Sequence, residues 1–320
     1  MKLKNILFSL IMLVSMLFIG TANAETTAPS SYVIDGSKLH TIYCSSYLKG
    51  CQYINIQFKK TTDGKIVYCI ERSKAPIGSG TTEKYTLQKE LSSKVAYVME
   101  NGYPNKSIFG NADKDYYTTG LAIWYVINPN DSTFEYFNLA NGTYRGNSSD
   151  IVVEMAKLVN GANSYSYTSP FIKINNSNSN LSLSSDGKYY VSSSMGVKTA
   201  GTVGNYTVSL SNAPEGTIVT DTKGNAKTTF ATNESFLVKV PVSNVKKISN
   251  EFKVNVSAKG TINKAYAYTS TRSNVQNTGA LYPENSNVND STTVKLNVVT
   301  VVEISKVDVT TGEELAGAHL

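Results

Sequence analysis

The sequence YYTTGLAIWYVI, residues 116–127, decides the fold class of the first half of the chain. This apolar stretch is long enough for a buried helix, and Asn128-Pro129 supplies the signal that ends it. Gly120 lies in the interior of the predicted helix, where glycine costs about 1 kcal/mol relative to alanine. Close approach of another backbone would explain this glycine, and so would the replacement of a larger residue.

Strand patterns precede this helix in the sequence. Residues 53–58 and 65–70 alternate between apolar and polar, and the turn signal Asp63-Gly64 lies between them. Such alternation around an Asp-Gly pair predicts a hairpin.

Two more helices are predicted in the first half. Apolar residues at helical spacing indicate a helix that ends at Asn101-Gly102, and they are Leu87, Leu91, Val95 and Val98. Residues 151–159 form another apolar stretch, with Asp150 as its expected N-cap. Strands and helices together make this half an α+β domain.

After about residue 169 the helical periodicity disappears. Short apolar runs separated by Gly, Asn, Asp and Pro predict a β-sandwich over residues 168–300. The abundant Asn, Ser and Thr residues of this region fit a solvated outer sheet face. The runs are residues 188–192, 206–210, 236–242, 252–256 and 293–302.

The N-terminus has the pattern of a secretory signal peptide. Lys2 and Lys4 precede an apolar run over residues 6–19 and small residues up to Ala24. An uncleaved anchor is the alternative, but the run is shorter than the roughly 20 residues of a membrane span. We expect residues 1–24 to be removed and the mature protein to work outside the membrane.

Composition and charge argue against several functional classes. Loss of Lys2 and Lys4 reduces the 30 basic residues to 28 against 24 acidic ones, an excess too small and scattered for nucleic acid binding. His40 and His319 do not supply both a histidine-based triad and a histidine-rich metal site. Asp and Glu show no metal-ligand spacing, and no glycine loop for phosphate is present. We therefore expect neither a metal nor a cofactor.

The mature chain keeps an odd number of cysteines, which is unusual for a secreted protein. Cys44 and Cys51 enclose a loop short enough for a disulfide, and two reduced thiols are the alternative. Cys69 lies in the strand-like run 65–71, where it is either a small buried apolar residue or a thiol with a function.

Two segments around this thiol resemble the signature segments of the Cys-Gln thioester domains of Gram-positive surface adhesins and pili. The first is Tyr68-Cys69-Ile70, and the second is Thr119-Gly120-Leu121-Ala122 followed by Ile123-Trp124. In that family the second segment reads Thr-Gln-x-Ala, usually followed by Ile-Trp, and the Gln side chain is joined to the Cys sulfur as an internal thioester. The resemblance covers residues 31–165 and implies a thioester-type domain over residues 25–167.

Gly120 stands at the position where this family has glutamine. A thioester forms when the thiol attacks a side-chain carboxamide and ammonia leaves, and glycine has no side chain to attack. We therefore expect the covalent step to be absent at Cys69. The spacing of the remaining glutamines marks none as a substitute, and they are Gln52, Gln57, Gln88 and Gln276.

Residues 304–318 resemble the opening of a SpaA-like (Cna-B) stalk domain. The resemblance implies that residues 301–320 are the first strands of a truncated stalk domain. It also implies that Lys306 is the lysine that forms an isopeptide bond with an asparagine on a later strand.

These features predict a secreted, cell-wall-displayed adhesin or pilus-tip subunit that is not an enzyme. An intact family member transfers its acyl group once to a target amine, so the implied partner is a host or extracellular-matrix protein, and pilus subunits are further partners. One alternative is a structural subunit that caps a pilus or surface fibre without binding. Another is an extracellular enzyme with Cys69 as nucleophile and His40 as its base.

Overall fold

The computed structural model describes residues 25–36, 40–42, 54–176, 180–247, 251–295, 307 and 309–313. The predicted signal peptide, the Cys44–Cys51 pair and Lys306 lie outside these residues. Two compact units divide the chain, the first with residues 1–171, 199–204 and 259–288, the second with residues 172–198, 205–258 and 289–320. Strands predominate in the described residues and α-helices accompany them, so the chain is broadly α+β as predicted.

The strands of the first unit pair in a closed ring. The order β20-β6-β5-β2-β7-β19 returns to its start because β19 also pairs with β20. Each strand of this ring therefore has a hydrogen-bonded neighbour on both sides. Its strands are β2 (Ser31–Gly36), β5 (Lys59–Thr61), β6 (Ile66–Cys69), β7 (Thr82–Glu90), β19 (Glu251–Ser270) and β20 (Thr278–Lys295).

Aromatic and aliphatic side chains from the ring strands and their loops form one core. The ring centroids of Tyr32 and Tyr268 are 4.1 Å apart, and the Tyr32 hydroxyl is 2.7 Å from that of Thr278. The first unit also contains the strands β1 (Glu25–Thr26), β3 (His40–Ile42), β4 (Ile54–Ile56), β8 (Phe137–Asn138), β9 (Thr143–Tyr144) and β10 (Asn147–Ser148). The core residues are Tyr32, Ile34, Val67, Ile77, Tyr85, Tyr266, Tyr268, Val275 and Ala280.

A hairpin lies at Asp63-Gly64, as the sequence predicts. β5 and β6 pair antiparallel across this turn, where Gly64 has a φ of +90° that favours glycine. The first strand of the hairpin differs from the prediction. It is Lys59–Thr61, whereas β4 (Ile54–Ile56) pairs with β3 in a separate sheet.

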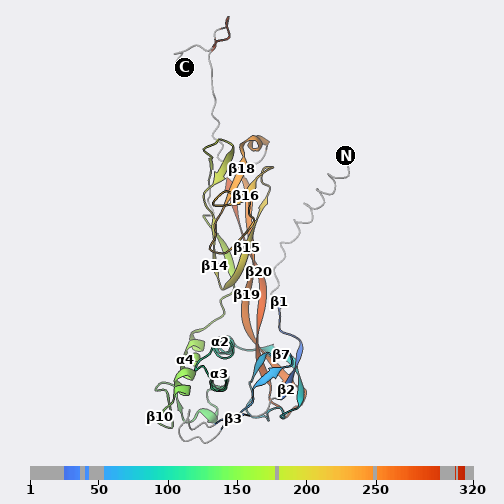
Figure 1. Cartoon of the computed structure of the whole chain (residues 1–320), viewed down its shortest axis with the longest axis vertical. Coiled ribbons are helices and arrows are strands. Elements are labelled where there is room, and N and C mark those ends of the chain that lie inside the picture. The colour runs from blue at the N-terminus through green and yellow to red at the C-terminus, as the bar shows by residue number, and fades with distance from the viewer. Residues whose placement is uncertain are drawn as a thin grey trace. The chain divides into compact units, whose positions relative to one another are not determined.

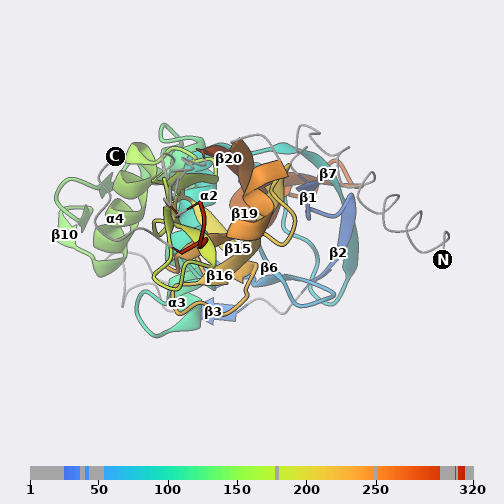
Figure 2. The ribbon, with the colours of Figure 1, turned by 90° about the horizontal axis from the view of Figure 1, so that it is seen from above.

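The helices α2 (Ser93–Asn101), α3 (Ala112–Ile127) and α4 (Asp150–Ser164) pack against one another. Figures 1 and 2 show them on one side of this unit, with β2 and β7 on the other side. Their shared core includes Tyr68, whose strand belongs to the ring, so this core joins the helices to the ring strands. Between α3 and β8 lies the short 3₁₀-helix η2 (Ser132–Phe134).

Several helix boundaries differ from the sequence prediction, among them the start of α3 at Ala112 and the end of α4 at Ser164. Leu87 lies in β7 rather than in a helix, because β7 pairs with β2 on one side and with β19 on the other. The first residues of β7 alternate between exposed and buried, as expected for a strand. The N-cap of α4 is Ser149, whose hydroxyl accepts a hydrogen bond from the Val152 amide, and Asp150 is the first helical residue. The predicted ends at Asn101-Gly102 and at Asn128 are confirmed.

The second unit is built mainly from β-strands. One sheet has the order β12-β13-β18-β16, and its central strand β18 alternates buried with half-buried residues. β15 pairs with β17, and β11 with β14. These strands are β11 (Phe171–Asn175), β12 (Leu181–Leu183), β13 (Tyr189–Ser192), β14 (Gly196–Ala200), β15 (Thr202–Ser211), β16 (Ile218–Asp221), β17 (Thr229–Phe230) and β18 (Phe236–Pro241), and the 3₁₀-helix η3 (Val242–Lys247) follows.

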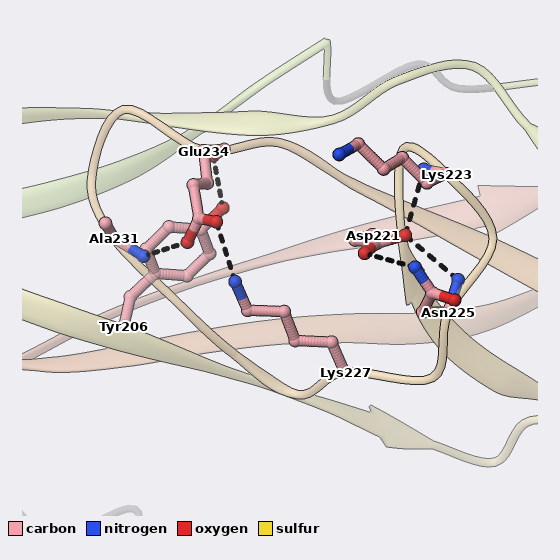
Figure 3. Close-up of polar contacts among 7 residues, drawn as sticks. All are labelled: Tyr206, Asp221, Lys223, Asn225, Lys227, Ala231 and Glu234. Atoms are coloured by element: carbon pink, nitrogen blue, oxygen red, sulfur yellow. Dashed lines mark hydrogen bonds and ion pairs between the residues drawn. The ribbon is translucent and has the colours of Figure 1, made fainter.

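Carboxylates fix the loops around β17 in the second unit (Figure 3). The Glu234 carboxylate accepts hydrogen bonds from the Lys227 amine and the Ala231 amide, both at 2.7 Å. Asp221 accepts from the amides of Lys223 and Asn225, which closes the turn after β16. These polar contacts order loops that have few apolar residues of their own.

A buried carboxylate ties β7 to the segment that follows β19. Glu83 is 5% exposed and accepts hydrogen bonds from the hydroxyls of Ser270 and Thr271 and from Arg272 Nε. Burial alone would raise the pKa of the Glu83 carboxyl, but these hydrogen bonds and the Arg272 charge lower it to about 2. The segment after Arg272 leads to Gln276, so Glu83 helps to position this glutamine.

We expect Glu83→Gln to lower the free energy of unfolding by about 1–3 kcal/mol at neutral pH, because a buried charged hydrogen-bond network is broken. A carboxyl with a lowered pKa stabilises the fold above its ordinary pKa of 4.5, and this contribution is lost as the pH falls through about 2. Urea unfolding of wild type and variant between neutral and acidic pH measures this, and the two curves should converge in acid. Glu90→Gln is the control: this exposed carboxylate on the same strand pairs with Lys264 at the surface, and an exposed ion pair contributes only about 0–1 kcal/mol, so the variant should change little.

Candidate functional site

Cys69 is the last residue of β6 and pairs with Thr278 of β20. Its thiol donates a hydrogen bond to the Glu71 carbonyl at 3.2 Å, and the residue is 7% exposed. Burial raises the pKa of the Cys69 thiol, and the charge of Lys59 and a hydrogen bond from Trp124 offset part of this shift. The thiol is therefore protonated at neutral pH and a weak nucleophile.

Helix α3 brings Gly120 to this thiol. The Trp124 indole N–H donates a hydrogen bond of 2.7 Å to the Cys69 carbonyl. Residues four apart lie one above the other on the same helix face. Gly120 therefore lies one turn from the contact that joins α3 to Cys69.

Polar contacts fix α3 at its N-terminal end. Asp115 is buried, and its carboxylate accepts hydrogen bonds from the Ser107 hydroxyl and from the amides of Ile108 and Phe109. One turn later the Thr119 hydroxyl donates to the Asp115 carbonyl and accepts from the Tyr103 amide. These contacts hold the helix, and with it Gly120, in a single position against β6.

A pair of stacked tyrosines lies between the strand and the helix. The rings of Tyr68 and Tyr116 are 4.6 Å apart with an interplanar angle of 17°. The Tyr68 hydroxyl donates to the Tyr103 carbonyl, and the Tyr116 hydroxyl donates to the Val67 carbonyl. Both hydroxyls therefore donate to backbone carbonyls, and Tyr116 also stacks on Phe58 with its other face.

A cavity of about 400 Å³ is lined by both Cys69 and Gly120. A Cβ atom added at Gly120 would meet only two ring carbons of Tyr68, at 3.7 and 3.9 Å, which is ordinary van der Waals distance. Close backbone approach therefore does not explain this glycine. The structure leaves open space at residue 120, on the side of the helix that faces the thiol's cavity.

Five other non-aromatic polar residues line the cavity, and sequence reasoning assigned none of them to the site: Gln57, Lys59, Arg72, Thr133 and Gln276. In the structure Gln57, Lys59 and Thr61 are buried while Lys60 between them is exposed, but the sequence did not show which face of this strand is buried. Gln276 follows β19, far along the sequence, and had no local signal either. Thus two carboxamides lie in the cavity of Cys69, although the position that the resemblance predicts has none.

Among the described residues, no group of His, Cys, Asp and Glu has the arrangement of a metal site. In the same residues no helix has the length and apolar character to span a membrane. Strand β3 contains His40, but the structure does not describe its side chain.

Residues 66–164 match the family model of the thioester domain. The chain contains a thioester domain. The matched segment includes β6 with Cys69 and α3 with Gly120, two of the elements that line the cavity. Among curated proteins no match to the chain was found.

Solved structures of thioester proteins share the fold. The Bacillus anthracis TIE protein has a TM-score of 0.58 and 24% identity, over 86% of this chain and 48% of its own. The thioester domain of the Enterococcus faecium TIE86 protein has a TM-score of 0.55 and 20% identity, over 86% of this chain and 99% of its own. The chain thus spans about half the length of the first of these proteins.

We expect native Cys69 to react with iodoacetamide at least about tenfold more slowly than in the unfolded chain, because it is buried and protonated. Alkylation with and without denaturant, followed by peptide mapping, separates Cys69 from Cys44 and Cys51. Trp124→Phe removes the hydrogen bond to the Cys69 carbonyl and should accelerate the native reaction. Equal rates in the native and unfolded chain would contradict the buried position of this thiol.

Proposed function

We propose that this chain is a secreted, cell-wall-displayed attachment protein whose thioester domain keeps the pocket of its family but forms no thioester. The observation that carries the proposal is the open space at Gly120 beside the cavity of Cys69. The partners are host or extracellular-matrix proteins and other pilus subunits, and binding to them is reversible. The resemblance of residues 304–318 to a stalk domain supports display on a fibre.

The chemistry of the site follows from the missing side chain. With glutamine at residue 120, the thiol would attack the carboxamide carbon, a C–S bond would form, the C–N bond would break and ammonia would leave. The glycine of this chain offers no carbon for that attack. Trp124 still holds Cys69 in place, so the scaffold for the reaction persists without its acyl donor.

The proposed domain layout is a thioester-type domain over residues 25–167, a β-sandwich over 168–300 and the first strands of a stalk domain over 301–320. An isopeptide bond at Lys306 and a disulfide between Cys44 and Cys51 belong to the same proposal. The compact units support a division near residue 170, and they also assign residues 259–288 to the first unit.

Intact mass spectrometry tests the missing thioester. We expect the mature wild-type chain to have its full calculated mass, whereas Gly120→Gln should lose one ammonia, because a Cβ atom at residue 120 makes only ordinary contacts and this residue lines the same cavity as Cys69. The control Cys69→Ala/Gly120→Gln should keep its full mass. Loss of ammonia in the wild-type chain would refute the proposal, and the variants Gln57→Glu and Gln276→Glu would then identify the acyl donor.

Binding experiments separate attachment from the structural alternative. We expect wild type to bind host cells or matrix proteins and to be released by detergent denaturation, because no bond to the target forms. Gly120→Gln should leave a fraction that denaturation does not release, and Cys69→Ala/Gly120→Gln should not. If neither wild type nor Gly120→Gln binds above background, the chain is better explained as a fibre cap that binds nothing.

A further inference from the structure

The amine of Lys59 takes no part in the bond-forming step at Cys69 and residue 120, yet it is buried next to Cys69. Lys59 is 5% exposed, and it pairs across β5 and β6 with Val67, two residues before Cys69. In the part of the chain that the structure describes, its amine has neither an ion pair nor a hydrogen bond. Burial lowers the pKa of this amine, and Cys69 opposes the shift. A buried cation without a partner is unfavourable, so an anion beside it would be stabilising.

The cavity itself supplies no anion. None of the described residues that line it is an aspartate or a glutamate. Arg72, the other cation of the lining, already has the Asp131 carboxylate at 3.9 Å and the Trp124 ring at 5.1 Å. Gln276 is 9% exposed, and its carboxamide adds a neutral hydrogen-bond donor. One unpaired cation and one amide donor match a single carboxylate group.

The walls of the cavity favour a flat apolar body. Tyr68 offers ring surface because its hydroxyl already donates to a backbone carbonyl, whereas Tyr116 is stacked between the rings of Tyr68 and Phe58 and presents only its edge. The space at Gly120 adjoins the Tyr68 ring. A volume of about 400 Å³ lies within the range of small-molecule pockets.

We propose that this cavity binds a small monocarboxylate non-covalently, with the carboxylate on the Lys59 amine and the Gln276 carboxamide and the apolar body against the Tyr68 ring beside Gly120. The inference rests on the proposed function only in that Gly120 leaves the space open. A monocarboxylate suits the site better than a phosphate, because one buried cation neutralises one negative charge.

Titration of the mature chain with benzoate and with benzamide, followed by NMR, tests this inference. The two probes have the same shape and differ in charge. We expect benzoate to bind at least about tenfold more tightly, which corresponds to about 1.4 kcal/mol. Lys59→Met should abolish this preference, whereas Lys60→Met, which alters the exposed neighbour, should keep it. An apolar side chain in place of a buried charge is often neutral or stabilising, so Lys59→Met is expected to fold, and the same spectra check this.

Equal binding of the two probes, or a preference that survives in Lys59→Met, would overturn the inference. So would inorganic phosphate that competes as well as benzoate. If Lys59→Met does not fold, Cys69→Ala/Gly120→Gln fills the space without forming a bond and must weaken benzoate binding. The benzoate titration and the mass measurement fail independently. If benzoate does not bind, the full mass of the wild-type chain still supports the proposed function. If the wild-type chain has lost ammonia, the proposed function is refuted whether or not benzoate binds.

Discussion

The hydrogen bond between the Trp124 indole and the Cys69 carbonyl is the contact on which the geometry of the site depends. A buried carbonyl needs a donor, and the indole N–H can only donate, so each group satisfies the other. Trp124 lies on α3 and Cys69 ends β6, so the bond joins the helical core to the ring of strands. The position of Gly120, one turn before Trp124, follows from this contact. The Tyr116 hydrogen bond to the Val67 carbonyl is a second link between α3 and β6, and together the two bonds fix the space at residue 120 relative to the thiol.

Local signals in the sequence predicted the elements that need no distant partner. The apolar run and the Asn-Pro stop were sufficient for α3, and Asp63-Gly64 was sufficient for the hairpin turn. The start of α3 was missed because Asp115 is a charged residue that is buried, and the amides that satisfy it belong to the preceding loop. Leu87 was misassigned because its spacing to later apolar residues fits a helix, whereas pairing of β7 on both sides fixes it as a strand.

Tertiary pairing determined what the sequence did not show. The ring closes through β19 and β20, whose residues 259–288 belong to the first unit although they follow most of the second in the sequence. Alternation shows that a strand has two faces, but it does not name the strand beside it. For this reason Gln276 had no visible link to Cys69, and Lys59 had no visible advantage over Lys60 as the buried lysine.

In most of the first unit the local sequence pattern fits the tertiary structure, as in the side-chain caps of α3 and α4 and the two cores, and the exceptions gather around one cavity. A glycine lies inside an apolar helix, where it costs about 1 kcal/mol relative to alanine. A lysine is buried without a partner in the described residues, and a buried cysteine has a raised pKa. Local departures of this kind are expected where a site rather than a core has been shaped. Because the cores on both sides are well packed, the fold tolerates a cavity that its own side chains leave incomplete.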